Sequence, residues 1–452
     1  MLRPWQVIIA CSLALLCIGL VMVSSAAMSL GGSPVTAQSI IFSRVGLYAG
    51  ISVALLGVVA LLPVRRVLLW ISGESAALPC HRPLPEVGAV GCSPRRGASE
   101  APTSPRRGRW HETPGAPDAP HPTPHTPRLL AGLPLLLVGT ILLLAAVATV
   151  YIPGIAAPKN NSHRWIEISM GGGRPISVQP SEIAKWGMVF LLAVVLTRRW
   201  AMMGRFFIGA LPMLASLGAV VLLVGIEDFG TAALIACVGG VLLLAGGMRI
   251  WQAGLLAPIG IGALAYLVIK EPYRVRRLTT FVDPFHDPQG AGYHMIQSMT
   301  TIAGGGPFGR GLGNGLQKFG YLPEQTTDFL FAVLCEEMGL AGAALVISLY
   351  LGILGASMLI LLREKTLVCR LAVIGVAATL GVQAVINIAV VTGWAPTKGI
   401  PLPLISAGGT GWLMTSFSLG AIISIGRSQE KLAAAEAEPE WDDEIELAPE
   451  PA

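Results

Sequence analysis

A long polar stretch separates two apolar parts of the chain. Residues 271–329 read EPYRVRRLTTFVDPFHDPQGAGYHMIQSMTTIAGGGPFGRGLGNGLQKFGYLPEQTTDF. The stretch combines arginines, acids next to prolines and a tract rich in glycine, and it ends where the chain turns apolar again. The apolar segments on either side are long enough to cross a bilayer. We therefore expect the polar chemistry of this stretch to lie at a membrane surface.

The composition is typical of a protein that crosses the membrane many times. Of the 452 residues, 53% are hydrophobic and 13% are charged, and the mean hydropathy is +0.67. These values exclude an ordinary soluble protein of several domains. The seven cysteines are scattered along the chain, so neither a disulfide framework nor a cysteine-based metal site is indicated.

Apolar stretches of transmembrane length recur along the chain. We expect an all-α polytopic membrane protein with about ten transmembrane helices and a large outer loop between the seventh and the eighth. The first stretch is interpreted as a retained helix and not as a signal peptide, because more spans follow it instead of a soluble domain. The expected spans, of which the fourth is the shortest, are 7–25, 45–62, 129–150, 183–196, 206–224, 231–248, 251–269, 329–362, 371–391 and 411–425.

Basic residues indicate which ends of these helices face the cytoplasm. With about ten spans, the basic loops all fall on one side, which the positive-inside rule assigns to the cytoplasm. Both termini then lie in the cytoplasm, and the loops 153–182, 271–327 and 393–410 face outward, where they can converge on one site. The basic residues are Arg65, Arg66, Arg198, Arg199, Arg205, Arg249, Arg363, Lys365, Arg370, Arg427 and Lys431.

The chain divides into four parts by composition. Residues 1–71 carry the first two helices, and residues 129–426 carry the other eight together with the outer loop 271–328. Residues 72–128 are rich in Pro, Arg, Gly, His and Ala, and residues 427–452 form an acidic cytoplasmic tail. A segment composed like 72–128 buries too little apolar surface to fold, so we expect a disordered cytoplasmic insertion.

Charged residues at two expected helix ends each leave two interpretations open. Lys185 falls inside the fourth span, where a charge indicates a functional site unless it only pairs with Glu182. Glu227 and Asp228 occupy a tight outer turn, where they either hold a cation or cap the next helix, capping being the commoner use.

The ninth expected span contains two amides, Gln383 and Asn387. Polar side chains in such a span more often bond neighbouring helices than touch a substrate. Residues 397–410, which follow this span, are punctuated by proline and glycine. Irregular backbone of this kind is tolerated at membrane depth where it is buried in protein or lines a cavity.

Several motifs together resemble the SEDS family of peptidoglycan glycosyltransferases. They are Gln-Pro-Ser-Glu-Ile-Ala-Lys at 179–185, Asp-Pro-Phe-His-Asp-Pro at 283–288, Leu-Pro-Glu-Gln-Thr-Thr-Asp-Phe at 322–329 and Pro-Thr-Lys-Gly at 396–399. The similarity covers almost the whole chain outside the insertion and the acidic tail. The glycine-rich tract and Pro-Thr-Lys-Gly are more similar to the cell-division members of the family than to the elongation members.

Three features depart from the pattern of the family. Ile226-Glu227-Asp228 stands where relatives have a Gln-Pro-Asp turn, which leaves the role of this turn open. Ala407 replaces a tyrosine before the glycine pair, and the insertion after the second span is long. None of these departures removes the carboxylate of Asp328.

The resemblance implies an enzyme that polymerises lipid II, a disaccharide-pentapeptide on undecaprenyl diphosphate, into glycan strands by inverting glycosyl transfer. The reaction would take place at the outer face of the bacterial cytoplasmic membrane, at the septum for a division member. Implied partners are a class B penicillin-binding protein and other division membrane proteins, with no nucleic acid. No cofactor is expected, and a divalent cation such as Mg²⁺ or Mn²⁺ is an open alternative.

The resemblance also implies a set of site residues. Asp328 is expected to take the proton of the attacking sugar hydroxyl, and its alternative role is to cap the eighth helix. Basic residues are expected to stabilise the diphosphate, unless the arginine cluster merely anchors the seventh helix to lipid head groups. The expected substrate-binding residues are Lys185, Arg164, Arg274, Arg276, Arg277, Lys398, Glu324 and Ser406, with no metal ligand.

Other functions are compatible with the same residues. A lipid II flippase would use Lys185, Asn387 and the polar loops to line a passage. An elongation-type polymerase would share the chemistry and differ in partners. A scaffold for a transpeptidase, without activity of its own, would not need Asp328.

Overall fold

The computed structural model describes residues 2–27, 37–41, 43–74, 132–152, 156–159, 162–168, 176–290, 292–317, 324–407 and 409–437. Most of the predicted insertion, from Ser75 onward, and the acidic tail beyond Ala437 lie outside the described residues.

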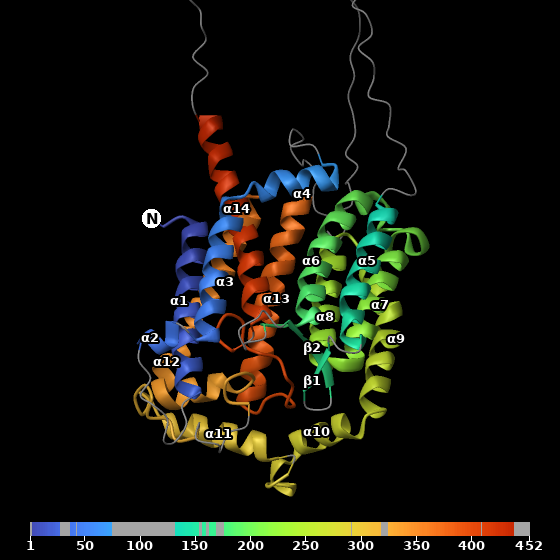
Figure 1. Cartoon of the computed structure of the whole chain (residues 1–452). Coiled ribbons are helices and arrows are strands. Elements are labelled where there is room, and N and C mark those ends of the chain that lie inside the picture. Colours follow the sequence, from blue (N-terminus) through green and yellow to red (C-terminus); the bar gives the residue numbers. More distant parts are fainter. Residues whose placement is uncertain are drawn as a thin grey trace, which may run out of the picture.

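Long helices form a bundle, and each of the predicted spans coincides with one of them (Figure 1). The helix at the C-terminal end continues to Ala437, into the part predicted as an acidic tail. The helices of the bundle are α1 (Pro4–Ala26), α3 (Arg44–Leu61), α5 (Leu133–Ala148), α6 (Pro180–Arg199), α7 (Leu211–Glu227), α8 (Phe229–Ala245), α9 (Ile250–Ile269), α12 (Leu330–Arg363), α13 (Leu367–Val391) and α14 (Thr410–Ala437).

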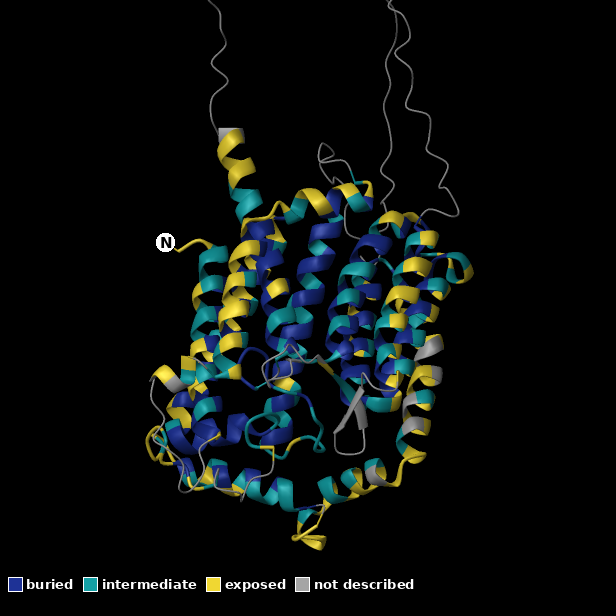
Figure 2. Cartoon of the chain, viewed as in Figure 1, coloured by how far each residue is buried: buried dark blue, intermediate teal, exposed yellow. Residues whose placement is uncertain are grey.

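Within the described part of the chain, seven helices are long and apolar enough to cross a bilayer. They are α1, α3, α5, α6, α7, α12 and α13, and shorter apolar helical segments cover Phe229–Ala245 and Ile250–Ala263. Large apolar side chains such as Ile141, Leu351 and Val385 stay exposed. Buried residues gather toward the interior of the bundle, and many exposed ones lie along its outer helices (Figure 2). Apolar surface of this extent is unfavourable in water but not in lipid. The chain is therefore a multi-pass membrane protein.

Helix α6 is longer than predicted. Pro180 begins the helix, Glu182 lies in its first turn, and Arg198 and Arg199 lie in its last turn. Proline suits a first turn, and these charges match the helix dipole at each end, so the polar residues extend the helix beyond its apolar centre. In its most apolar part, 67% of the residues of α6 are buried. The helix therefore lies at the centre of the bundle, where it packs on α5, α8 and α13.

Shorter helices lie across the two ends of the bundle. The polar stretch 271–329 contains α10 (Pro272–Val282), a short 3₁₀ turn (Pro284–His286) and α11 (Tyr293–Gly305), which cross one end of the bundle (Figure 1). At the opposite end lies α4 (Val64–Ser72), on the same side as the start of α1 and the end of α14 (Figure 1). The start of α1 and the end of α14 therefore lie on one side of the bundle (Figure 1).

A small sheet, which the sequence did not predict, accompanies the helical bundle. Strands β1 (Ala156–Lys159), β2 (Ser162–Ile168) and β3 (Ile176–Val178) form an antiparallel sheet with β2 in the middle, and Ile166 of β2 faces Val178 of β3. All three strands lie within residues 153–182, which were predicted to form an outward-facing loop. Its β-branched residues favour strands, and pairing satisfies its backbone groups.

Helix α12 is kinked at Gly339, whose backbone has a φ of 67°. A Cβ at this position would stand 2.3 Å from the backbone nitrogen of Gly309, so only glycine fits. The kink allows the backbone of the glycine-rich tract to pack directly against α12.

Candidate active site

Asp328 lies in the turn that leads from the polar stretch 271–329 into α12. The side-chain amide Nδ2 of Asn387 on α13 donates to its backbone carbonyl at 2.9 Å. Two residues earlier, the carbonyl of Thr326 accepts a hydrogen bond from the backbone N–H of Ala407 at 3.0 Å. Two segments distant in sequence therefore hold this turn in place.

The Asp328 side chain does not cap α12. The N-cap residue of that helix is Phe329, and its side chain makes no capping hydrogen bond. Capping was the alternative role for this carboxylate, and the structure does not place it there.

Charged groups from four segments surround the partly buried carboxylate of Asp328. Burial is the largest effect and raises its pKa to about 7. The carboxylates of Glu324 and Asp228 add to this increase, whereas the guanidinium groups of Arg277 and Arg164 lower the pKa. A carboxylate with such a pKa is suited to general-base catalysis near neutral pH.

The segment that carries the Pro-Thr-Lys-Gly motif approaches Asp328 through Gly399. A Cβ at Gly399 would lie 3.2 Å from Asp328 Oδ2 and 3.7 Å from Arg164 Nη1. The carboxylate and the guanidinium thus meet at a backbone position that carries no side chain.

Three of the predicted arginines are held by backbone carbonyls. Arg164 Nε donates to Glu227 O at 2.8 Å, and Arg274 Nη2 donates to Ile226 O at 2.8 Å. Both carbonyls belong to the C-terminal end of α7, where a positive charge is favourable. Arg277 Nη1 donates to Thr397 O at 3.2 Å, which ties α10 to the segment before Gly399.

Phe229 provides an aromatic contact for two of the predicted cations. Lys398 Nζ lies 4.9 Å from the centre of its ring, and the Arg274 guanidinium carbon lies 5.6 Å from it. Burial lowers the pKa of Lys398. The ring attracts both cations and keeps them at the start of α8, beside Asp228.

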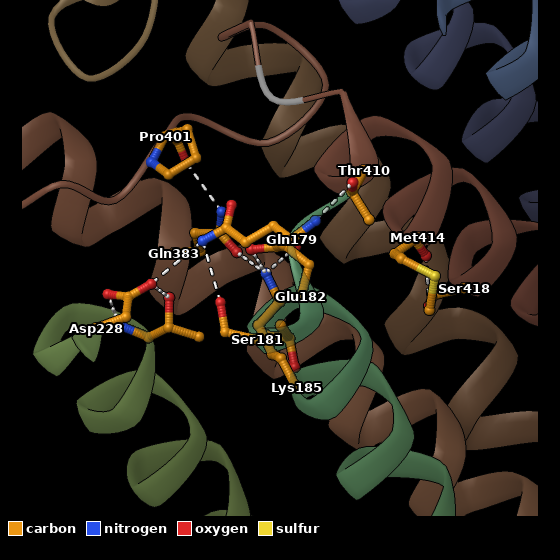
Figure 3. A network of polar contacts seen from close by, with 12 residues as sticks. Gln179, Ser181, Glu182, Lys185, Asp228, Gln383, Pro401, Thr410, Met414 and Ser418 are labelled. Atoms are coloured by element: carbon orange, nitrogen blue, oxygen red, sulfur yellow. Dashed lines mark hydrogen bonds and ion pairs between the residues drawn. The ribbon is translucent and has the colours of Figure 1, made fainter. Parts of the chain in front are cut away.

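Asp228 caps α8, as the commoner of its two predicted roles requires. Its Oδ1 accepts from the backbone N–H of Thr231 at 3.1 Å, and its Oδ2 accepts from Thr231 Oγ1 at 2.7 Å. Gln179 Nε2 donates to the same Oδ2 at 3.3 Å (Figure 3).

Lys185 is buried inside the bundle, on the part of α6 that faces α13. Its Nζ lies 2.7 Å from Glu182 Oε2 and donates to Gln383 Oε1 at 2.8 Å (Figure 3). Gln383 in turn donates to Pro401 O at 2.9 Å. The structure thus shows the pair with Glu182 that was the alternative to a substrate-binding role.

The structure therefore divides the predicted site residues into groups. Asp328, Glu324, Arg164 and Arg277 lie together, and Lys398 and Arg274 meet at Phe229 nearby. The side chain of Ser406 is buried and accepts from Leu402 N at 3.0 Å, so it shapes the 397–410 segment. Arg276 is exposed on α10. Among the described residues, no group of three or more His, Cys, Asp or Glu side chains is placed to hold a metal ion.

Two buried acids in α12 were missed by the sequence analysis. Glu336 accepts from Leu316 N at 2.9 Å, and Glu337 accepts from Gly313 N at 3.0 Å and from Ser25 Oγ at 2.7 Å. They attach the glycine-rich tract and α1 to α12. Adjacent acids within an expected span were a signal that could have revealed them.

A family model described as "Cell cycle protein", covering FtsW, RodA and SpoVE, matches residues 127–431, which is more than half of the chain. The chain belongs to this family. It is the SEDS family that the sequence motifs resemble. The matched region contains Asp328 and every residue around it.

Named relatives in the family are identical to this chain at more than a third of the aligned positions. A probable peptidoglycan glycosyltransferase FtsW of Geobacter sp. is 36% identical over 291 residues, covering 64% of this chain and 77% of the relative. The corresponding protein of Coxiella burnetii is 38% identical over 300 residues, covering 66% and 78%. Stage V sporulation protein E of Bacillus subtilis is 35% identical over 279 residues, covering 62% and 75%.

Solved structures share the SEDS fold. A chain from a peptidoglycan synthase complex, described as coordinating polymerization and crosslinking, has a TM-score of 0.61 at 22% identity, over 93% of this chain and 97% of that one. RodA of Thermus thermophilus has a TM-score of 0.53 at 21% identity, over 93% and 96%.

Proposed function

We propose that this SEDS protein is a peptidoglycan glycosyltransferase that polymerises lipid II into glycan strands at the outer face of the cytoplasmic membrane. The single observation that carries the proposal is the position of Asp328. Its carboxylate lies where residues 271–329 lead into α12, within the electrostatic influence of the Arg277 and Arg164 guanidinium groups, with a pKa of about 7. The names of the relatives support the class of reaction.

The reaction requires one base and a cationic environment for the leaving group. The acceptor sugar hydroxyl attacks the anomeric carbon of the donor, a new C–O bond forms, and the bond to the diphosphate breaks. Asp328 takes the hydroxyl proton, and the diphosphate leaves with the bonding electrons. Arg164, Arg277, Arg274 and Lys398 supply positive charge where negative charge develops.

The same proposal includes topology and partners. About ten transmembrane helices with both termini in the cytoplasm would place α10, α11 and the sheet outside. The start of α1 and the end of α14 lie on one side of the bundle and α10 and α11 on the other, which supports this topology (Figure 1). A class B penicillin-binding protein is the proposed partner, because the structurally similar chain comes from a complex that couples polymerization and crosslinking. The relatives named FtsW favour septal wall synthesis together with other division proteins over an elongation role.

The decisive experiment is polymerisation of lipid II by purified protein, with and without a class B partner. Moenomycin is added to silence contaminating classical transglycosylases. The wild type should form polymer, and Asp328→Asn should lose about 100- to 10,000-fold in rate while it still inserts and binds its partner. Transport of lipid II without polymer would instead identify a flippase, and wild-type growth and septation with Asp328→Asn would identify a scaffold.

A further inference from the structure

Helix α13 carries two buried amides one turn apart, and both face the backbone of the segment after the helix. Gln383 Nε2 donates to Pro401 O at 2.9 Å. Asn387 Nδ2 donates to Ile400 O at 2.8 Å and also to Asp328 O at 2.9 Å. Of these two amides, Asn387 is the one that bonds both the segment and the turn that carries the candidate base.

The bridge uses both hydrogens of a single amide group. Because the two acceptors are carbonyl oxygens, the nitrogen of Asn387 must point toward them, and the reversed amide would place oxygen against oxygen. Its Oδ1 is buried and has no hydrogen-bond partner among the residues that the structure describes. The side chain is thus arranged for its two donors, even though its acceptor is left unsatisfied.

The bridge fixes the backbone on both sides of the reacting carboxylate. Ile400 follows Gly399, and a Cβ at Gly399 would lie 3.2 Å from Asp328 Oδ2 and 3.7 Å from Arg164 Nη1. Any widening between the backbones of Asp328 and Ile400 moves the carboxylate away from this backbone and from the guanidinium. It also admits water to the carboxylate.

We propose that Asn387 is the positioning residue for Asp328, holding the candidate base against the Gly399 backbone by clamping two carbonyl groups. The inference rests on the proposed glycosyltransferase function and deepens it. Asn387 touches neither substrate nor the reacting atoms. It acts on the geometry and the hydration of the carboxylate.

The clamp also influences the pKa of Asp328. Burial raises the pKa of Asp328, Glu324 and Asp228 raise it further, and Arg277 and Arg164 lower it. Opening the clamp weakens the contribution of burial, which is the largest. The pKa of Asp328 should therefore fall, and the pH at which the base becomes ionised should decrease.

The test compares Asn387→Leu, which keeps the volume and removes both donors, with Thr379→Val on the same helix. Among the described residues, Thr379 Oγ1 donates only to Gly375 O, within α13. Thr379→Val is therefore a matched control, because it also removes a buried donor. In the lipid II assay, Asn387→Leu should lose kcat on the order of 100-fold with little change in KM, because a small misplacement of a reacting group has effects of that size. The acid limb of its pH–rate profile should shift to lower pH, and Thr379→Val should behave like the wild type.

A readout that does not depend on turnover separates this inference from the proposed function. Carbodiimide labels protonated carboxyl groups, so mass spectrometry of labelled Asp328 as a function of pH reports its midpoint of ionisation. The midpoint should lie lower in Asn387→Leu than in the wild type. If Asn387→Leu does not insert, Asn387→Ser, which keeps one donor on a shorter side chain, replaces it in both assays.

An unchanged labelling midpoint, or a wild-type kcat in folded Asn387→Leu, would overturn the positioning role. That result would leave the proposed function intact as long as Asp328→Asn remains inactive. If the wild-type protein forms no polymer, the proposed function fails, and the labelling midpoint still decides whether Asn387 controls Asp328.

Discussion

The α carbon of Gly399 faces the carboxylate of Asp328, and a Cβ there would stand 3.2 Å from Oδ2. Gly399→Ala should displace this carboxylate by a few tenths of an ångström and lower kcat by about 10-fold, since catalysis is sensitive to small misplacements. The control is Gly218→Ala on α7, where a Cβ meets nothing within 4 Å. Equal rates of lipid II polymerisation for the two variants would show that the close approach has no catalytic role.

The pH dependence of polymerisation should follow the ionisation of Asp328. Only the ionised carboxylate accepts a proton, so the rate should rise with pH through a midpoint of about 7. The sign follows from the raised pKa, because the protonated, inactive form persists to higher pH than for an ordinary aspartate. Initial rates measured from pH 5 to pH 9 define this acid limb of the pH–rate profile. A rate that is already constant from about pH 5 upward would contradict a base with this pKa.

The two adjacent arginines of α10 should differ in importance. Arg277 lowers the pKa of Asp328 and bonds Thr397 O, whereas Arg276 is exposed. Arg277→Gln should reduce turnover and move the acid limb to higher pH, because an attractive charge near the carboxylate is lost. Arg276→Gln should change little, since exposed charges contribute weakly. Membrane insertion of both variants is measured in parallel. If both lose activity and insertion to the same extent, the arginines only anchor the helix to lipid.

The buried pair of Lys185 and Glu182 should stabilise the fold as a unit. Lys185→Met leaves Glu182 buried without its counter-ion and should cost about 3–5 kcal/mol. The double variant Glu182→Gln/Lys185→Met should recover much of that loss, which thermal unfolding in detergent can measure. A stable double variant that no longer binds lipid II would instead support the predicted substrate-binding role of Lys185.

The predicted insertion should be removable, provided that Glu74 is kept. Its carboxylate accepts from Leu367 N at 2.9 Å and from Val368 N at 3.1 Å, so it caps the start of α13. Deletion of 75–127 should leave polymerisation largely intact, because its composition predicts little contribution to packing. Deletion of 74–127 should lower the free energy of unfolding by an additional ~1 kcal/mol. Loss of activity in the shorter deletion, with normal insertion, would assign a role to the segment.

Hydropathy and local spacing predicted much of this architecture. Every expected span coincides with a helix, and the i, i+3 spacing of Glu182 and Lys185 indicated the pair that the structure shows. The cap formed by Asp228 on α8 is equally local. The sheet around Ile166 was missed because its strands are short and pair with segments elsewhere in the chain. The register of such a pairing cannot be read from the pattern of one segment alone.

The sequence by itself determined where the chain forms apolar helices long enough to cross a bilayer, and which residues pair locally within them. Those properties depend on the composition of about 20 consecutive residues and on the need of each helix to satisfy its own backbone. Only the tertiary structure decided that Asn387 bonds Asp328, that Gly399 leaves room for the carboxylate, and that Phe229 meets Lys398. These contacts join residues far apart in the chain, and they arise from how the helices and the outer segments pack together, which local patterns do not specify.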